Sequence, residues 1–306
     1  MRFDVPHPIP YQGSKRRLAR AILSHIETGR YARLVEPFAG SGAVTLAAAQ
    51  RGTAKEFLLG DKLEPLVSLW QSIIENPNSI ADEYEELWRR ERRSPIDEYY
   101  AVRDEFNSDR RPAKLLYLLA RCVKNAVRFN PAGDFNQSPD KRRAGTRPET
   151  MRKELKGAHR LLHGRTRAVC ADFLEIFHKS GPEDFFYLDP PYQGTSDGRD
   201  SRYIDGVTRE RIIEGLNLLN ERGNPFILSY DGSCGDKTYG DRLPSELASR
   251  ILLDVGRSSQ ATLNGKHYIT IESLYISHNL VPAVVDETVM GLREFEEPRL
   301  LTGSLF

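Results

Sequence analysis

The sequence has 306 residues, of which 39% are hydrophobic and 28% charged, and its formal net charge is only +1. That length predicts about two domains with a buried core, and it contains no run of about 18 apolar residues and no basic-then-apolar leader, so we expect a cytoplasmic protein that does not contact a membrane. Its three cysteines, Cys122, Cys170 and Cys234, are scattered without a CxxC pair, which supports neither a disulfide framework nor a cysteine zinc site.

The first part of the chain predicts a βαβ unit. A helix is expected over 14–28, and RLVEPF then has the composition of a strand over 33–38. The turn AGSG leads to a helix over 43–52 that closes at a glycine, and the next strand, 55–60, ends at Asp61.

A helical and basic segment follows. Helical spacing of apolar residues continues from about 62 to 128, and it returns over 149–163 after a loop with glycine, proline and asparagine turn signals. Residues 141–167 hold ten Lys or Arg against two acidic residues, a local charge of +8. Such an excess is typical of a surface that follows a polyanion, although a solvated charged face has the same composition.

The remaining chain returns to alternating elements. Strands are expected over 167–172, 184–188 and 225–230, with helices over 173–179 and 209–222. KHYITIESLYISH then alternates as an antiparallel strand does, after a hairpin turn at Asn264–Gly265. The pattern predicts one α/β sheet interrupted at roughly 75–165.

The stretch EPFAGSGAV places a glycine turn between strand and helix. Such a turn lets the backbone approach a nucleotide closely. The third glycine of GxGxxG is absent, and Asp61 lies 19 residues past Gly42, where a carboxylate can bind ribose hydroxyls. The turn therefore favours an adenosine-containing ligand over NAD, with a tight turn that binds nothing as the alternative.

The stretch DFFYLDPPYQG ends an apolar strand with an acid, two prolines and a tyrosine. Asp189 stands at the strand exit, and Pro190 and Pro191 remove two successive backbone donors. The turn offers oxygen acceptors and the aromatic face of Tyr192, which suits an amino group on a planar ring; a stiff strand exit is the structural alternative.

Together these motifs resemble a known family, the Dam-type (D12 class) DNA adenine methylases. The resemblance is carried by YQGSKRRL (11–18), LVEPFAGSG (34–42), LLGDK (58–62) and YLDPPY (187–192), with weaker similarity at RFNPAGDFN (128–136), ADF (171–173), ILSYDG (227–232) and NGKHYITIESLYISHN (264–279).

The resemblance implies a fold, an activity and a cofactor. The fold would be a Rossmann-like S-adenosylmethionine-dependent methyltransferase sheet with a helical, basic inserted DNA-recognition domain. Its parts would be a discontinuous catalytic domain (1–75 and 166–280), a target-recognition insertion (76–165) and a C-terminal appendage (281–306). The enzyme would transfer a methyl group from S-adenosyl-L-methionine to N6 of an adenine flipped out of double-stranded DNA.

The resemblance also implies residue roles. The catalytic residues would be Asp189, Pro190, Pro191 and Tyr192. The cofactor would be bound by Tyr11, Lys15, Phe38, Gly40, Gly42, Asp61, Asp172, Phe173 and Asp189. Candidate DNA contacts are Arg128, Asn130, Asn136, Gln137, Lys141, Arg142, Arg143 and Arg147.

QSPDKRRAGTRPETM departs from the Dam pattern, so the family's GATC target is not carried over. A restriction endonuclease of the same system is an expected partner, and we expect a monomer.

Several alternatives stay open at this point. The same turn would suit methylation of cytosine N4, of adenine in RNA or of a protein glutamine amide, and a DNA-binding module with a degenerate cofactor pocket is a non-enzymatic alternative. An NAD oxidoreductase is disfavoured by the missing glycine. His159 and His163 lack the glutamate of an HExxH motif, so no metal site is predicted.

Overall fold

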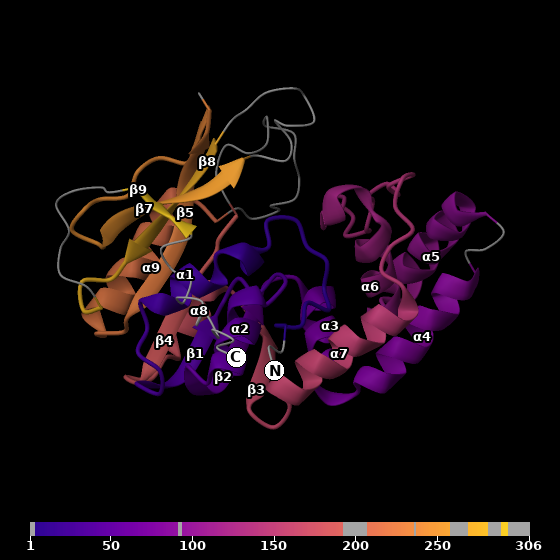
Figure 1. The fold of residues 1–306 in the computed structure, drawn as a ribbon, viewed down its shortest axis with the longest axis horizontal. Coiled ribbons are helices and arrows are strands. Elements are labelled where there is room, and N and C mark those ends of the chain that lie inside the picture. The colour runs from indigo at the N-terminus through magenta and orange to yellow at the C-terminus, as the bar shows by residue number, and fades with distance from the viewer. Residues whose placement is uncertain are drawn as a thin grey trace, which may run out of the picture.

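The chain is described here from a computed structural model, which describes residues 4–90, 94–191, 207–235, 237–257, 269–280 and 289–292. The described strands form one nine-stranded sheet in the order β3-β2-β1-β4-β5-β8-β7-β9, with β6 paired to β5 (Figure 1). The strands are β1 (Tyr31–Glu36), β2 (Ala54–Asp61), β3 (Thr166–Cys170), β4 (Asp184–Leu188), β5 (Phe226–Cys234), β6 (Lys237–Tyr239), β7 (Ser249–Arg257), β8 (Ile269–Ile276) and β9 (Val289–Gly291).

Strands β3, β2, β1, β4 and β5 are parallel, whereas β8 runs antiparallel to both β5 and β7. The chain order reverses between β1 and β4, which is the switch point where ligands of open α/β sheets bind. The predicted α/β class with a Rossmann-like sheet is confirmed.

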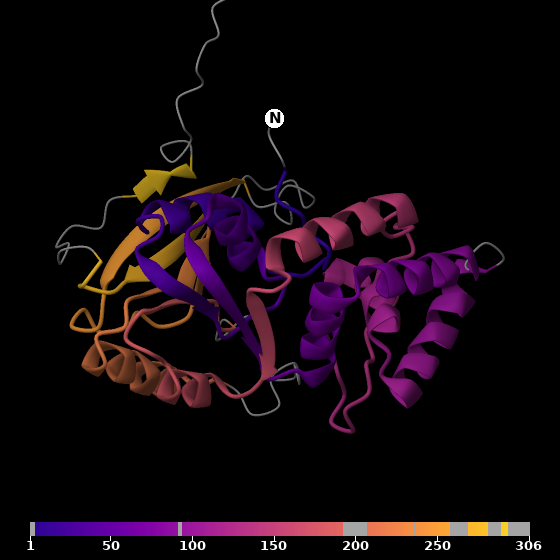
Figure 2. The ribbon, with the colours of Figure 1, turned by 90° about the horizontal axis from the view of Figure 1, so that it is seen from below.

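Side-chain alternation along the parallel strands builds a separate core on each face of the sheet. On one face, Leu34, Phe185 and Tyr187 join the cluster under α1 (Ala19–Ser24) and α2 (Ala43–Arg51). On the other face, their neighbours Val35 and Phe186 pack under α8 (Phe173–His178) and α9 (Arg209–Glu221). Figure 2 shows α8 and α9, in salmon and orange, on the side of the sheet opposite the indigo helices.

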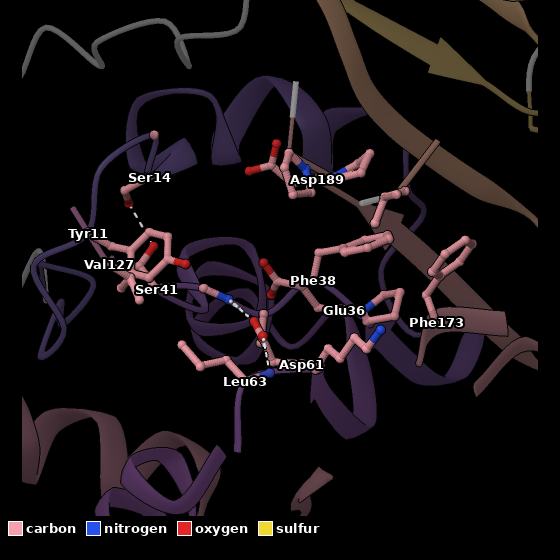
Figure 3. A pocket seen from close by; sticks show the side chains of 18 of the residues that line it. Tyr11, Ser14, Glu36, Phe38, Ser41, Asp61, Leu63, Val127, Phe173 and Asp189 are labelled. Atoms are coloured by element: carbon pink, nitrogen blue, oxygen red, sulfur yellow. Dashed lines mark hydrogen bonds between the residues drawn. The ribbon is translucent and has the colours of Figure 1, made fainter. Parts of the chain in front are cut away.

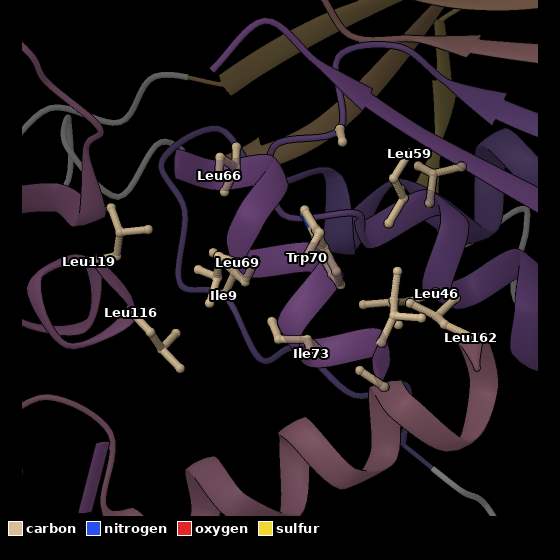
Figure 4. Close-up of a cluster of buried hydrophobic side chains, with 14 of the residues drawn as sticks. Ile9, Leu46, Leu59, Leu66, Leu69, Trp70, Ile73, Leu116, Leu119 and Leu162 are labelled. Atoms are coloured by element: carbon tan, nitrogen blue, oxygen red, sulfur yellow. The ribbon is translucent and has the colours of Figure 1, made fainter. Parts of the chain in front are cut away.

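The helical part lies to one side of the sheet in both views (Figures 1 and 2). It contains α4 (Pro77–Arg90), α5 (Pro95–Asp109), α6 (Pro112–Arg121), η2 (Val123–Asn125) and α7 (Pro148–Leu162), and it packs on α3 (Glu64–Glu75) through α6 and α7. One hydrophobic cluster runs from Leu46 and Leu59 through α3 to Leu116 and Leu162 (Figure 4). The helices therefore share a core with the sheet; the proposed domain limits at 75 and 165 stay a prediction.

Two predicted helices are shorter than expected. The helix expected over 14–28 divides into η1 (Lys15–Arg17) and α1. The long apolar run after Pro112 stops at Arg121, because Cys122 takes an extended conformation with φ of −75° and ψ of 161°. Lys124 and Asn125 then adopt left-handed φ values of 60° and 53°. The Asn125 amide then donates to the Leu119 carbonyl, at 2.7 Å, and satisfies the helix end.

The antiparallel character of KHYITIESLYISH is confirmed by β8, whereas the turn at Asn264–Gly265 lies outside the described residues. Strand β9 falls within 281–306, the segment expected to be an appendage, and it pairs in parallel with β7. Among the described residues, no helix has the length and apolar content needed to cross a membrane.

Candidate active site

A pocket of about 540 Å³ opens at the carboxyl ends of β3, β2, β1 and β4 (Figure 3). Residues from the amino-terminal segment, the glycine turn, the ends of these four strands and the loop after α6 line it. Its size falls within the range of small-ligand sites, about 300–1,000 Å³. Sequence positions as distant as Tyr11, Asp61 and Asp189 therefore meet in one cavity.

The glycine turn after β1 has no room for side chains. Gly40 and Gly42 have positive φ values of 46° and 57°, and a Cβ on Gly42 would lie 2.7 Å from the Trp70 ring. A Cβ on Gly40 would lie 3.2 Å from the Tyr11 ring. The Gly40 peptide is held on both sides, since its N–H donates to Asp61 Oδ2 at 3.3 Å and its carbonyl accepts from Trp70 Nε1 at 3.0 Å.

Asp61 occupies the last position of β2 and faces the same turn. Its Oδ1 accepts the Leu63 N–H at 2.9 Å, and burial raises its pKa, against the lowering effect of these backbone donors. Each carboxylate oxygen keeps lone-pair capacity beyond one hydrogen bond. The carboxylate can thus accept from a ligand hydroxyl while it fixes the turn.

Glu36 ends β1 inside the pocket and is 3% exposed. Its Oε2 accepts from both the backbone N–H (3.0 Å) and the hydroxyl (2.6 Å) of Thr45 in α2. Burial raises its pKa to about 8, and the nearby Asp189 carboxylate adds to the rise. Burial therefore favours the protonated, neutral form of Glu36.

Two aromatic rings form one wall of the pocket. The Phe38 and Phe173 rings lie 5.2 Å apart, and Figure 3 shows both at the cavity. Next to them, Asp172 caps α8 by accepting from the Leu174 N–H at 3.0 Å, and its Oδ1 also binds Arg211 Nη2 at 2.8 Å. The wall places aromatic rings beside a carboxylate, which suits a planar heterocycle with an amino group.

Asp189 follows β4 directly and faces the cavity with a 21% exposed side chain. Its Oδ1 lies 2.9 Å from the Lys15 ammonium. Burial raises the pKa of Asp189, the Lys15 charge opposes this, and Glu272 adds to it. Pro190 and Pro191 also line the pocket, whereas Tyr192 lies outside the described residues.

These features make the pocket suited to a nucleoside with a cationic or amino-bearing tail. It combines a glycine cradle, a buried carboxylate at the end of β2, an aromatic wall and a second carboxylate at the strand exit. Within the described residues, no group of three His, Cys, Asp or Glu side chains is arranged to hold a metal ion.

The candidate DNA contacts lie in the loop after α6 and before α7. Arg128 Nε is buried and has no hydrogen-bond partner among the described residues. Asn130 Oδ1 accepts the Asp134 N–H at 2.8 Å, so this side chain closes its own turn. Gln137 Nε2 reaches the Val123 carbonyl at 3.4 Å, and Asn136 is exposed.

The basic segment 141–167 divides into exposed and paired cations. Lys141 and Arg147 are exposed, as is Arg142 at 91%, and Arg143 lies 3.3 Å from Asp140. Arg152, by contrast, binds Asp82 and Glu85, and Arg165 donates to the carbonyls of Leu161 and Ala49. Only part of the +8 excess is therefore available to a polyanion, and the DNA contacts stay predictions.

Sequence reasoning missed three contributions to the pocket. Glu36 of the EPF motif had no predicted role, and Trp70 was expected only as an apolar position of a predicted helix. The loop residues Ala126, Val127 and Phe129 reach the cavity from the helical part. The acid directly before the glycine turn was a usable signal for Glu36, whereas the other contacts depend on how the helices pack.

Comparisons with known proteins show which family the chain resembles. The family model described as D12 class N6 adenine-specific DNA methyltransferase matches residues 11–259. The chain is 25% identical over 236 residues to the DNA N-6-adenine-methyltransferase of Escherichia phage P1, a match that covers 73% of this chain and 29% of that protein. It is 28% identical over 250 residues to the Type II methyltransferase M.MjaIII of Methanocaldococcus jannaschii (74% of this chain, 84% of that protein). It is also 28% identical over 231 residues to the Retron Ec67 DNA adenine methylase of Escherichia coli (72% and 75%).

Proposed function

The chain belongs to the D12 class of N6 adenine-specific DNA methyltransferases, and from this premise we propose that its pocket binds S-adenosylmethionine beside an adenine flipped out of duplex DNA. The activity predicted from the sequence, DNA adenine methylation, is confirmed by the family. The donor, the roles of individual residues and the further partners are the proposal.

The pocket fits this donor in three places. The glycine turn lines the pocket at Gly40, next to Tyr11, so a ligand's methionine part would lie against its backbone. Asp61 would accept the ribose hydroxyls, and Asp172 with the Phe38–Phe173 wall would hold the adenine ring. When bound, S-adenosylmethionine supplies an electrophilic methyl group carried on a sulfonium sulfur.

Asp189 would orient the target amine. The N6 amine of adenine is a weak nucleophile because its lone pair is delocalised into the ring. The Asp189 carboxylate and the Pro190 carbonyl can each accept one N6–H, which favours a pyramidal nitrogen with a free lone pair. After N6 has formed its new bond to carbon, it carries a positive charge, and the Asp189 carboxylate can take the proton that N6 then loses.

The two prolines keep this site selective for a donor group. Neither Pro190 nor Pro191 has a backbone N–H, so no neighbouring amide competes with the substrate for the acceptors. Their fixed φ angles hold the Pro190 carbonyl in place and restrict the backbone of Asp189 before the base arrives. Tyr192 would stack on the flipped base.

The loop after α6 brings DNA to the pocket in this proposal. It lines the cavity at Ala126, Val127 and Phe129, and the exposed cations Lys141, Arg142 and Arg147 follow it in the chain. These cations would bind phosphates and set the register, whereas Arg128, Asn130, Asn136 and Gln137 would read base edges.

One observation carries the proposal: the Asp189 carboxylate and the glycine cradle line the same pocket, on the two sides of the sheet's switch point. The test is methyl transfer from labelled S-adenosylmethionine to unmethylated genomic DNA, followed by nucleoside digestion and mass spectrometry. N6-methyladenine is the expected product. N4-methylcytosine would change the substrate, and no methylated nucleoside despite donor binding would reject DNA methylation at this pocket.

Fewer observations support the further partners, the location and the oligomeric state. A relative named as a Type II methyltransferase supports the expectation that a restriction endonuclease accompanies this enzyme. The DNA substrate supports the expected cytoplasmic location. A monomer is expected, and light scattering of the purified chain with and without DNA measures it.

A further inference from the structure

Lys15 lies between two carboxylates that come from different strands. Its ammonium is 2.9 Å from Asp189 Oδ1 and 3.6 Å from Glu272 Oε2, and its side chain is only 6% exposed. The Gly13 carbonyl is a further acceptor at 3.5 Å. Asp189 belongs to the proposed catalytic turn, whereas Glu272 has no role in the proposed methyl transfer.

Side-chain alternation along β8 places Glu272 beside Lys15. On β8, Glu272 and Leu274 point to the same face, and Leu274 belongs to the core cluster under α1. Asp189 shares this face with Tyr187 by the same alternation. Lys15, just before α1, therefore bridges two carboxylates across the intervening strand β5.

A local irregularity of β5 lets β8 come close enough. The register between β5 and β8 shifts between Ser229 and Gly232, and a Cβ on Gly232 would lie 2.4 Å from the Ile271 carbonyl oxygen. The motifs ILSYDG and ITIESLYISHN thus build the approach that places Glu272 beside Lys15. This gives both stretches a purpose that the catalytic turn alone does not explain.

The Lys15–Asp189 pair conflicts with the proposed chemistry. An Asp189 oxygen that is bound to an ammonium is a weaker acceptor for the adenine amine, because the positive charge competes for the same lone pairs. Asp189 therefore accepts from the amine at full strength only when Lys15 loosens its hold on Oδ1. A buried ammonium that loses one of its counter-charges is destabilised unless another carboxylate stays close to it.

We propose that Glu272 is a positioning residue that holds the Lys15 ammonium while the Asp189 carboxylate turns to the amino group of the target base. The inference rests on the proposed function. The exchange transfers no proton or electron pair, since Lys15 stays charged and only its nearest carboxylate changes. Without Glu272, Lys15 stays bound to Asp189, and the amine meets an occupied acceptor.

The test is a double-mutant cycle in the full-length chain with Glu272→Gln, Lys15→Met and both together. We expect Glu272→Gln to lower kcat by roughly tenfold, with the donor's dissociation constant changed less than about twofold, because Glu272 does not line the pocket. In the Lys15→Met background, the same substitution should have no further effect. Glu221→Gln, on the exposed end of α9, is the matched control and should leave kcat unchanged.

Three results would overturn the inference. A normal kcat for Glu272→Gln would show that Lys15 needs no second carboxylate. An equal loss with and without Lys15 would assign Glu272 to the stability of the hairpin, which thermal unfolding and the Glu272→Asp variant would report independently. A wild-type chain that binds the donor but methylates no adenine would remove the proposed function and this inference with it, whereas an active wild type with unaffected variants removes the inference alone.

Discussion

The contact between Gly42 and Trp70 allows a prediction with an internal control. Gly42 and Gly52 both have positive φ, 57° and 74°, at the two ends of α2. A Cβ on Gly42 would meet the Trp70 ring at 2.7 Å, whereas a Cβ on Gly52 would meet nothing within 4 Å. Alanine at either position therefore incurs the backbone strain, but only Gly42→Ala adds a steric clash.

The expected magnitudes separate the two variants. Left-handed alanine costs about 1–2 kcal/mol, and overpacking a well-packed site adds roughly 1–3 kcal/mol. Trp70 cannot move aside cheaply, since it is 1% exposed and its Nε1 donates to Gly40. Gly42→Ala should thus lose about 2–5 kcal/mol of unfolding free energy, against about 1–2 kcal/mol for Gly52→Ala.

Urea unfolding and calorimetric binding of S-adenosylhomocysteine measure both effects. Gly42→Ala should weaken ligand binding because the turn shifts, whereas Gly52→Ala should bind normally. Adding Trp70→Phe to Gly42→Ala should recover part of the stability, since the smaller ring vacates the contact. Equal destabilisation by the two alanines, or no recovery, would refute the steric argument.

Three further predictions concern catalysis, pH and DNA. Asp189→Ala should lower methyl transfer by at least about 10²-fold while donor affinity, measured by calorimetry, stays nearly unchanged; equal loss of both would reject its assignment as the group that orients the amine. Glu36 holds a proton in the folded state up to its raised pKa of about 8, against an ordinary 4.5, so its contribution to stability is complete below about pH 4.5 and is lost as the pH rises to 8. Glu36→Gln should therefore flatten the fall of unfolding free energy between pH 6.5 and 8, and a slope identical to wild type would contradict the burial argument. Arg128→Ala should lower the free energy of discrimination for the cognate site by about 1–3 kcal/mol and relax the sequence preference, as sequencing of methylated positions would show. Uniform weakening on all sequences would indicate a phosphate contact instead.

Much of the fold could be predicted from local pattern. Strand β4 has the predicted limits, and α2 ends at its predicted glycine, because burial on both faces and a left-handed cap leave clear signals in the sequence. The end of α6 could not be predicted in this way. Apolar spacing continues past Arg121, and the helix stops because Cys122, which is neither glycine nor proline, takes an extended backbone conformation.

The candidate site also contains some residues that local sequence patterns predict and some that they do not. Motif residues such as Asp61 and Asp189 stand at strand ends, so topology alone brings them to one edge of the sheet. Trp70 and Glu272 reach the site through helix packing and through pairing with a distant strand, and neither has a local signature. Asn130 is a predicted DNA contact, yet its side chain accepts a hydrogen bond within its own turn, which the sequence did not indicate.

The shared core has a consequence for engineering new sequence specificity. Exchanging recognition modules between relatives treats the helical part as a cassette, yet Leu66, Leu69 and Ile73 of α3 pack in the same cluster as Leu116 and Leu119 of α6. Trp70 on that same helix supports the glycine turn. A junction on either side of α3 therefore divides a packed interface, and a graft should match the residues of α3 to both the bundle and the glycine turn that they contact.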